Sequence, residues 1–491
     1  MSSSIEFDRI DDFFPPHFTG EERSRAKTLF FKNVSLALHG FYNGKMQTIP
    51  KCAIEGLGWF NAWYTPGVSK ISTVIRDDND ASFALSNRGN LVAVVSDSTR
   101  VLGDGDCTPA GGLGVMEGKA LLMKYLGGVD ATALCVDSRG KDGKNDPEKL
   151  IEFVKMCQHS FGAVNLEDIS QPNCFRALDE LRESCDIPVW HDDAQGTACV
   201  ILAGLVNALK LAGKTLGGVH IVLLGAGAAN VTTSRLIMEA GGDPGKITLF
   251  DINGGLHAGR SDIENDPRAY RQWELCLKTN PQRIASVEEA MKNADVLIAL
   301  SAPGPDTVKR AWVRSMADKA IVFACANPTP EIWPYAAKEE GAFIIATGRG
   351  DFPNQVNNSI CFPGILKGAL LVRSRKITDR MVIRCSRSIA EFSEQRGISP
   401  DNIIATMDET ELFAREAADV AETAIHEGVA RVTLSRDEAY RRAKADIEAA
   451  HRVAKHLQEM EDIVKPPKAL VEKALKEAIQ EASEKQKLCS R

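Results

Sequence analysis

The chain has 491 residues, of which 25% are charged, and its formal net charge at pH 7 is −7. That length exceeds what one hydrophobic core accommodates and predicts about two to four domains. Because charges of both signs are interspersed, the composition argues against a nucleic-acid-binding stripe or a membrane-surface patch, and we expect neither kind of partner.

The cysteines and the N-terminal segment indicate in which cellular compartment the protein is expected. The 12 cysteines are scattered without a Cys-x-x-Cys pair, which removes the ligand spacing of zinc, cluster and thioredoxin-type sites. Residues 1–30 are rich in acids and lack an apolar core segment, which excludes a secretory signal and disfavours a mitochondrial transit peptide. No uninterrupted apolar run approaches the roughly 18 residues of a membrane span. We therefore expect a cytoplasmic protein.

Residues 1 to about 60 are predicted to be mostly helical and to end in an aromatic, glycine-rich stretch. Short apolar runs then alternate with segments of helical periodicity, which predicts right-handed βαβ units and a parallel sheet. The predicted strands of this first series are 91–95, 133–137, 163–166 and 187–190, with helices near 147–160 and 172–184.

A second series of apolar runs follows a predicted helix over 197–212. The spacing of its strands is typical of a doubly wound nucleotide-binding domain. Beyond about residue 365 the chain turns helical, and from roughly 433 it becomes strongly charged, as expected of a solvated helical extension that packs on its own or a partner subunit. The predicted strands of the second series are 220–225, 246–251, 295–300, 320–325 and 342–347.

A glycine-rich turn marks a candidate dinucleotide site. Gly225-Ala-Gly227 follows an apolar strand and precedes a predicted helix over 229–240, and Asp251 closes the next strand. Glycine permits the tight turn and the close approach of a pyrophosphate, and the acid accepts from a ribose hydroxyl. Asn230 stands where the fingerprint usually has Gly or Ala, and buried strand-to-helix turns favour glycine without any nucleotide. The placement inside a full βαβ series favours the nucleotide interpretation.

The choice between NAD and NADP stays open. Asp251 would repel a 2′-phosphate, whereas a basic residue of a neighbouring loop, for example Arg260, would offset that repulsion. The candidate coenzyme-binding residues are Gly225, Gly227, Ala228, Asn230, Asp251, Asn327 and Asn357.

Acidic residues follow two strands of the first series and predict a metal site. Glu167 and Asp168 follow one strand and Asp193 follows another, and parallel strands deliver their C-terminal ends to the same edge. Converging carboxylates repel each other unless a cation is present, and oxygen ligands suit Mg²⁺ or Mn²⁺. Asp192 points the opposite way in an extended chain and is expected to hydrogen-bond a ligand or a lysine. The alternative is that these acids cap helices.

Two residues are candidates for proton transfer. Lys119 follows the glycine-rich stretch 108–114 and is expected on the first turn of an apolar helix, where an enclosed site near a metal would depress its pKa and make it a base. Tyr64 lies in a rigid Trp-Tyr-Thr-Pro-Gly turn and would deliver a proton to a carbanion. The alternatives are a solvated lysine and a tyrosine of the core or rim.

Arg100, Asn327 and the pair Asn357-Asn358 are candidates for carboxylate recognition. Asparagines in loops are usually turn formers. Both asparagine segments, however, follow strands of the predicted nucleotide domain on its ligand edge.

Six of these segments resemble malic enzymes, in the order found in that family, and most strongly its shorter, bacterial-type branch. The resemblance covers residues from about 40 to 420 and implies that Glu167, Asp168 and Asp193 bind Mn²⁺ or Mg²⁺. It also implies that Lys119 and Tyr64 are catalytic and that Asp192 supports the lysine and the metal. The matching segments are those around Tyr64, Lys119, Glu167-Asp168, Asp192-Asp193, Asn327 and Asn357-Asn358.

The resemblance implies oxidative decarboxylation of (S)-malate to pyruvate and CO₂ with NAD⁺ or NADP⁺, in a homodimer or homotetramer. Asn327 and Asn358 would hold the malate carboxylate, and Arg100 would do so as in the longer branch. The chain departs from the family pattern in the acidic residues of 101–109, in Asn230 and in the charged tail after about residue 430. Two alternatives are a redox-neutral malolactic decarboxylation and a non-catalytic dinucleotide-binding regulator.

The expected fold class is α/β. Residues 1–190 would form a helical segment and a parallel-sheet substrate domain that binds malate and metal. Residues 191–358 would form a Rossmann-like doubly wound NAD(P) domain. Residues 359–491 would return to the substrate domain and end in a charged helical extension.

Overall fold

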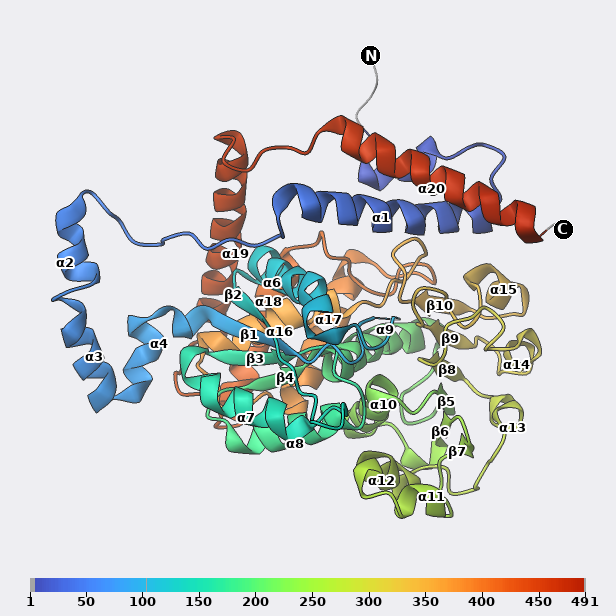
Figure 1. Ribbon diagram of the computed structural model, residues 1–491. Helices are drawn as coiled ribbons and strands as arrows, with labels where there is room; N and C mark the ends of the chain where they lie inside the picture. Colours follow the sequence, from blue (N-terminus) through green and yellow to red (C-terminus); the bar gives the residue numbers. More distant parts are fainter. Residues whose placement is uncertain (1–4, 103, 490–491) are drawn as a thin grey trace. The chain divides into compact units, whose positions relative to one another are not determined.

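The computed structural model describes residues 5–102 and 104–489. The chain divides into two compact units (Figure 1). Both ends of the chain form the first unit, which comprises Met1–Ile49 and His451–Arg491, and Pro50–Ala450 form the second.

The first unit is built on two long helices, α1 (Gly20–Tyr42) and α20 (Lys468–Cys489). A capping box starts α1, because the Thr19 side chain accepts from the Glu22 backbone N–H and the Glu22 carboxylate accepts from the Thr19 backbone N–H. Apolar side chains at a spacing of four residues then face one side of each helix. The buried members are Ala26, Phe30 and Val34 of α1 and Ala474, Ala478 and Ala482 of α20. The charged C-terminal extension is therefore helical, as predicted, and it packs on the N-terminal helix of its own chain.

The second unit contains all the strands that the structure describes. Helix α19 (Arg436–Glu459) runs from this unit into the first. The strands are β1 (Leu91–Ser96), β2 (Asp130–Cys135), β3 (Ala163–Leu166), β4 (Val189–His191), β5 (Ile221–Leu224), β6 (Ile247–Asp251), β7 (Gly254–Gly255), β8 (Val296–Ala299), β9 (Ile321–Ala324) and β10 (Ile344–Thr347). The helices before α19 are α2 (Phe60–Trp63), α3 (Val68–Asp77), α4 (Ser82–Leu85), α5 (Thr108–Gly111), α6 (Leu113–Gly127), α7 (Pro147–Cys157), α8 (Asn173–Ser184), α9 (Thr197–Ala212), α10 (Ala228–Glu239), α11 (Ser261–Glu264), α12 (Tyr270–Lys278), α13 (Val287–Met291), α14 (Arg310–Arg314), α15 (Pro334–Glu339), α16 (Phe362–Leu371), α17 (Asp379–Arg396) and α18 (Glu411–His426).

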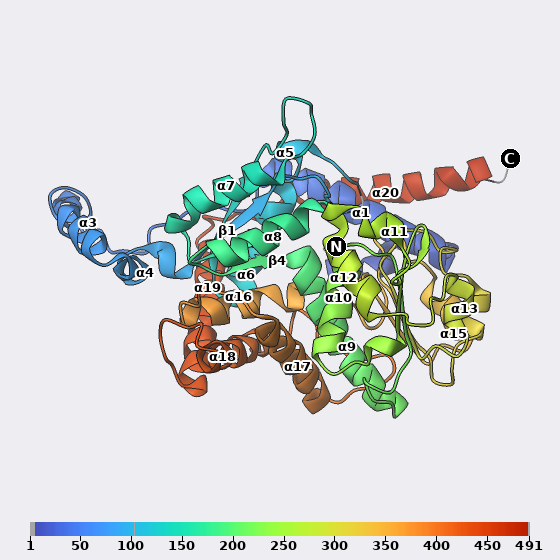
Figure 2. The ribbon, with the colours of Figure 1, turned by 90° about the horizontal axis from the view of Figure 1, so that it is seen from below.

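The first sheet is parallel and has the strand order β2-β1-β3-β4. Helices α7 and α8 pack together on one face, and α6 and α16 pack together on the other (Figure 2). Burial on both faces explains why β1 and β3 read as nearly continuous apolar runs. Because α16 follows β10 in the chain yet packs on α6 and β3, the segment after the second sheet returns to the first.

The second sheet has the order β10-β9-β8-β5-β6-β7, and only the short β7 is antiparallel. This is the doubly wound order: strands are added on one side of β5 as far as β7 and then on its other side from β8 onward. Such a switch of strand order leaves a crevice at the carboxyl ends of β5 and β8. Alternate residues of each strand enter different cores: Val222 and Leu297 pack toward α13 and α14, and Leu223 and Ile298 join the main core. The predicted fold class is confirmed.

Helix α9 connects the two sheets. The segment Asp192–Ala212 is apolar and long enough to cross a membrane by length and composition, but 78% of its most apolar window is buried inside the protein. It is therefore a core helix, and its apolar character reflects packing on α10 and α17.

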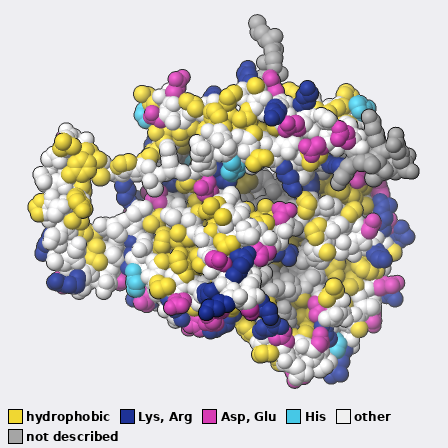
Figure 3. Space-filling model, viewed as in Figure 1, with side chains coloured by type: hydrophobic (Ala, Val, Ile, Leu, Met, Phe, Trp, Pro, Cys, Tyr) yellow, Lys and Arg dark blue, Asp and Glu magenta, His cyan; other side chains and the backbone are white. Residues whose placement is uncertain are grey.

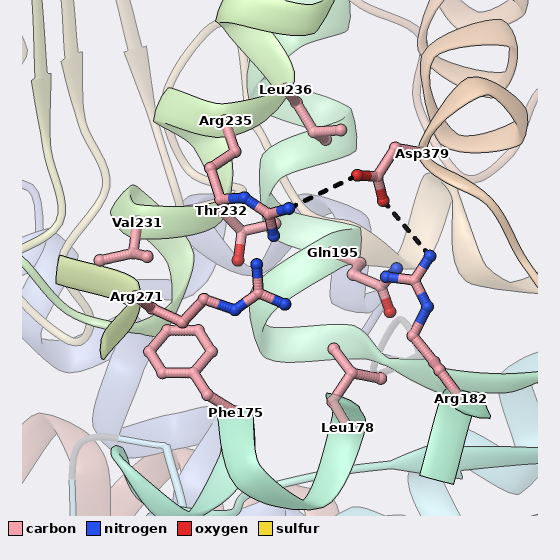
Figure 4. A pocket seen from close by; sticks show the side chains of 10 residues that line it. All are labelled: Phe175, Leu178, Arg182, Gln195, Val231, Thr232, Arg235, Leu236, Arg271 and Asp379. Atoms are coloured by element: carbon pink, nitrogen blue, oxygen red, sulfur yellow. Dashed lines mark hydrogen bonds and ion pairs between the residues drawn. The ribbon is translucent and has the colours of Figure 1, made fainter. Parts of the chain in front are cut away.

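A polar junction joins helices that belong to the two sheets (Figure 4). Arg182 of α8 and Arg235 of α10 both point toward Asp379 of α17, with N···O separations of 3.5 Å and 3.9 Å. A cavity of about 10 Å³, room for one water molecule, lies among them. Ion pairs of this length hold weakly. The apolar side chains of Phe175, Leu178, Val231 and Leu236 line the same cavity and pack beside the charged groups.

An arm formed by residues 54–77, which includes α2 and α3, projects from the first sheet in both views (Figures 1 and 2). Hydrophobic side chains gather on it (Figure 3). Exposed apolar patches of this kind mark interaction surfaces. Its exposed large hydrophobic residues are Ile54, Leu57, Trp59, Phe60, Trp63, Tyr64, Val68 and Ile71.

Candidate functional site

The carboxyl ends of β3 and β4 bring the acidic residues together. Leu166 pairs with His191 in the parallel register, so the residues that follow each strand leave the sheet side by side. Ligand oxygens of Glu167, Asp168 and Asp193 lie within 4.8 Å of one another. The structure thus brings together the three carboxylates that were expected at one edge of the sheet because they follow parallel strands.

Local backbone geometry aims Asp168 and Asp193 at each other. Asp168 adopts a left-handed conformation with φ of 52°, which turns the chain sharply after β3. Its backbone N–H donates to Asp193 Oδ2 at 2.8 Å. Within the described part of the chain, Asp168 Oδ2 is buried and has no hydrogen-bond partner. The Asp193 carboxylate thus accepts a hydrogen bond from the loop that follows β3. This contact argues against the alternative that the acid only caps a helix.

The electrostatics of this cluster favour a cation. Burial raises the pKa of Glu167 well above its usual range, and the nearby carboxylates of Asp193 and Asp192 add to that effect. Burial and the charge of Asp193 raise the pKa of Asp168 to about 7. An all-oxygen set with an unsatisfied buried acceptor is the donor chemistry that Mg²⁺ and Mn²⁺ prefer, so the residues present fit such an ion.

Lys119 lies in the same cluster, near the middle of α6 and not on its first turn as predicted. Its Nζ is 3.1 Å from Glu167 Oε1, donates to Asp192 Oδ2 and lies 4.5 Å from the centre of the Phe362 ring. The predicted depression of the Lys119 pKa supposes a nearby metal ion, and the shift in the cluster of side chains alone runs the other way. Burial lowers the pKa of Lys119, but the charges of Asp192, Glu167 and Asp193 together raise it above the ordinary value.

Asp192 lies outside the group of three converging acids but shares Lys119 with Glu167, in line with the expectation that it hydrogen-bonds a lysine. It is fully buried, accepts from Lys119 and from Trp190 Nε1 at 3.0 Å, and opens the π-helical turn η6 (Asp192–Gly196). The sequence interpretation missed Trp190, and it missed Asn165, whose Nδ2 donates to Glu167 Oε2 at 2.9 Å. Trp190 and Asn165 each lie two residues before the acid to which they donate. Residues two apart in a strand share a face, so this spacing could have identified them from the sequence.

Two other residues predicted to belong to the site, Tyr64 and Arg100, are exposed. Tyr64 is at the end of α2 on the projecting arm, and its side chain is 71% exposed. The single chain therefore does not bring Tyr64 to the acidic cluster. Arg100 is exposed, but its backbone N–H donates to the Asp168 carbonyl at 3.0 Å, which places its loop beside the cluster.

The glycine-rich turn lies at the crevice of the second sheet. Gly225 has φ of 96°, and a Cβ at this position would meet the Leu300 carbonyl oxygen at 2.4 Å, so the turn requires glycine. Helix α10 starts at Ala228, directly after the extended Gly227. The first N–H groups of α10 thus open at the switch point between β5 and β8, where a pyrophosphate fits.

Asn230 does not face this crevice, which corrects its assignment as a coenzyme contact. The side chain is fully buried, and its Nδ2 donates to the carbonyls of Leu224 and Gly225 at 3.0 Å and 2.9 Å. It therefore braces the turn from beneath. A larger polar side chain replaces the usual Gly or Ala because it satisfies these backbone acceptors.

Asp251 ends β6 and is held by Arg260. The guanidinium donates to both carboxylate oxygens, at 3.0 Å and 2.6 Å, and also pairs with Asp262. The basic residue considered from the sequence is thus in direct contact with the acid. Arg260 is therefore shared between Asp251 and Asp262.

The asparagine segments follow β9 and β10. A Cβ on Gly348 would stand 2.9 Å from Asn327 Nδ2, and a Cβ on Gly196 would stand 3.1 Å from the Asn358 Cβ, so Asn358 lies beside η6. Asn357 caps η9 (Asn358–Ile360), because its Oδ1 accepts from the Ser359 N–H. Asn357 and Asn358 are partly exposed and Asn327 is exposed, so all three remain accessible to a ligand.

Glu331 is a further residue that sequence reasoning missed. It is fully buried and accepts from the backbone N–H groups of Ser301 and Ala326 at 2.8 Å and 3.0 Å. These residues follow β8 and β9, so Glu331 ties together the loops at the carboxyl edge of the second sheet. Burial raises its pKa.

Comparison with known proteins agrees with this geometry. Residues 58–182 match the malic enzyme N-terminal domain, and residues 194–425 match the malic enzyme NAD binding domain. The chain is 40% identical to the bifunctional malic/malolactic enzyme of Bacillus subtilis over 82% of this chain and 95% of the relative. A crystal structure of Entamoeba histolytica malic enzyme superposes with a TM-score of 0.95 at 59% identity, covering 98% of this chain and 100% of that one. A Pyrococcus horikoshii malic enzyme gives a TM-score of 0.80 at 44% identity, with coverage of 84% and 94%. This chain belongs to the malic enzyme family.

Proposed function

We propose that the protein oxidatively decarboxylates (S)-malate to pyruvate and CO₂ with NAD⁺ or NADP⁺. The observation that carries this proposal is the burial of Lys119 against Glu167 and Asp192 at the edge where the first sheet leads into the nucleotide-binding sheet. A buried proton acceptor beside a carboxylate cluster suits removal of a hydroxyl proton, and the adjacent doubly wound sheet suits hydride transfer.

Glu167, Asp168 and Asp193 would hold Mg²⁺ or Mn²⁺. Such an ion lowers the pKa of a coordinated hydroxyl and polarises a carbonyl, and the nicotinamide accepts the hydride. Neutralising the carboxylates would also lower the pKa of Lys119 toward the range in which it accepts a proton, since their charge is what raises it.

The chain's own residues then account for the proton movements. Lys119 takes the proton of the malate C2 hydroxyl as the C2 hydride leaves, and Asp192 keeps the Lys119 Nζ oriented. The C3–C4 bond of the keto acid breaks, CO₂ departs, and the electron pair forms the enolate of pyruvate. Tyr64 donates the proton that C3 requires. Asn327, Asn358 and Arg100 would position the carboxylates.

A second candidate is redox-neutral conversion of malate to lactate. The Bacillus subtilis relative is named a bifunctional malic/malolactic enzyme, and the same carboxylates and lysine would serve both reactions. The two outcomes differ in products, because only oxidative decarboxylation leaves reduced coenzyme in solution.

The direct test is nicotinamide absorbance with malate, each divalent cation, and NAD⁺ against NADP⁺. We expect malate-dependent reduction that requires a cation and that reveals the preferred coenzyme. Lactate formed without net reduction would favour the second candidate, and absence of any malate turnover would contradict both.

We infer that the protein works as a homodimer or homotetramer in the cytoplasm. The exposed apolar face of the arm supports self-association, because burying such side chains on a second copy removes them from water. It also provides a route for Tyr64, since a docked arm would carry Tyr64 into the site of the neighbouring copy.

Mixed dimers of a Tyr64→Phe chain and a Lys119→Ala chain test this arrangement. If the arm supplies Tyr64 to the partner's site, one site of the mixed dimer carries both changes and the other carries neither. We then expect each mixed dimer to recover about half of the wild-type dimer's activity. Co-expression with two different affinity tags isolates the mixed species, and mass measurement in solution gives the subunit number. Mixed dimers as inactive as their parents would show that Tyr64 acts within its own chain.

A further inference from the structure

A second group of side chains that could hold a metal ion lies in the core, and the proposed reaction does not use it. Cys199 of α9, Cys361 at the start of α16 and Cys385 of α17 are fully buried. Their sulfur atoms lie within 4.8 Å of one another, and the Cys361 and Cys385 sulfurs are 3.9 Å apart. Three helices from separate parts of the chain therefore converge on one cluster of thiols.

A buried carboxyl group lies beside one of the three thiols. Glu416 of α18 is fully buried, and its Oε1 lies 3.7 Å from Cys385 Sγ, which donates to it. Its Oε2 has no hydrogen-bond partner within the described part of the chain. Burial raises the pKa of Glu416 well above its ordinary value. Leaving such a group unsatisfied is costly, and packing alone would favour an apolar side chain here.

The dimensions suit a tetrahedral ion. Sulfur atoms that are at most 4.8 Å apart lie within about 2.8 Å of a common point, and a Zn–S bond is about 2.3 Å. The 3.9 Å separation of the Cys361 and Cys385 sulfurs is close to the edge of a tetrahedral zinc-thiolate site. Small side-chain adjustments would therefore place all three sulfurs around one ion. The Glu416 carboxylate, which contacts the Cys385 sulfur, would have to rotate toward the other two sulfurs to become the fourth ligand.

We propose that Cys199, Cys361, Cys385 and Glu416 bind a structural zinc ion, separate from the carboxylate site. Zinc is the common ion for which mixed thiolate and carboxylate ligands in tetrahedral geometry are usual. On binding, the thiols and the carboxyl group lose their protons to solvent, and four ligand-to-zinc bonds replace the thiol contacts.

One contact helps the cluster to carry negative charge, because Ser386 Oγ donates to Cys199 Sγ at 3.2 Å. Burial opposes that charge, since it raises the pKa of Cys361, the N-cap residue of α16, well above its ordinary value. The ion would pin α9, α16, α17 and α18 together. Because the Cys361 N–H donates to the Asn358 carbonyl at 2.9 Å, it would also fix the loop that carries Asn358.

The test is zinc content of the full-length protein, purified without a metal-affinity step from zinc-supplemented cells and dialysed against EDTA. We expect about one zinc per protomer in the wild type and less than about a tenth of that in Cys385→Ser and Glu416→Gln. The matched control is Cys276→Ser on α12, another buried cysteine, which should retain the ion. Protein from cobalt-supplemented cells should show thiolate-to-cobalt charge-transfer absorption that Cys385→Ser loses.

A second measurement does not depend on whether the variants fold. Titrating the wild-type protein with a thiol-selective mercurial should release zinc to a colorimetric chelator in step with modification of three thiols. Zinc-free wild type with free thiols, or with a Cys361–Cys385 disulfide, would overturn the proposal. So would zinc retained equally in Cys385→Ser.

Discussion

Replacing Lys119 with alanine is expected to lower kcat for malate oxidation by about two to four orders of magnitude, the usual contribution of a positioned proton acceptor. The side chain is the one cation that contacts both Glu167 and Asp192 among the described residues. Its loss removes the acceptor for the hydroxyl proton and leaves Asp192 buried without its partner. Steady-state kinetics with malate and saturating coenzyme measure the effect.

Lys124 provides the matched control, because it lies on the same helix, is 41% exposed and pairs with Asp130 away from the acidic cluster. Lys124→Ala should keep kcat within about threefold of wild type, as expected for a surface ion pair. Thermal unfolding of both variants separates lost chemistry from lost structure. A folded Lys119→Ala enzyme with near-wild-type kcat would show that Lys119 is not the proton acceptor.

Replacing Asp193 with alanine is expected to weaken activation by Mg²⁺ or Mn²⁺ by about 100-fold or more, since it removes one of three oxygen ligands. Its carboxylate also accepts from the Asp168 N–H, so the remaining acids would lose their relative orientation. Activity of EDTA-treated enzyme titrated with each cation gives the activation constant.

Asp137 is a suitable control for this titration. It also lies just beyond the end of a strand of the first sheet, β2, but its side chain is 67% exposed and pairs with Arg139. Asp137→Ala should leave the activation constant unchanged. An unchanged constant in Asp193→Ala would contradict the proposed ligand set.

The alternation of apolar runs and helices predicts most of the fold, because buried parallel strands need continuous apolar sequence. The helix over 197–212 is confirmed as α9. The second strand of the first sheet is observed at Asp130–Cys135, earlier than the predicted 133–137. Pairing with β1, in which Leu91 lies opposite Asp130, sets its start rather than its own apolar pattern.

The site could be predicted where strand ends determine it. Glu167, Asp168 and Asp193 meet because their strands are parallel neighbours. The protonation of Lys119 could not be predicted, because it depends on three carboxylates converging on one buried nitrogen. The role of Asn230 likewise depends on carbonyls that point into the turn from beneath.

The cysteine cluster shows a different limit. Cys199, Cys361 and Cys385 are far apart in the chain, so the absence of Cys-x-x-Cys spacing excludes local zinc motifs but not a site assembled by packing. Only the return of α16 and α17 to α9 brings these residues together.

The most direct measurement of the central claim is product stoichiometry with malate, a divalent cation and the preferred coenzyme. The account predicts equal amounts of pyruvate, CO₂ and reduced nicotinamide, all lost in Lys119→Ala and after removal of the cation. Lactate without reduced nicotinamide, or turnover that persists without any divalent cation, would contradict it.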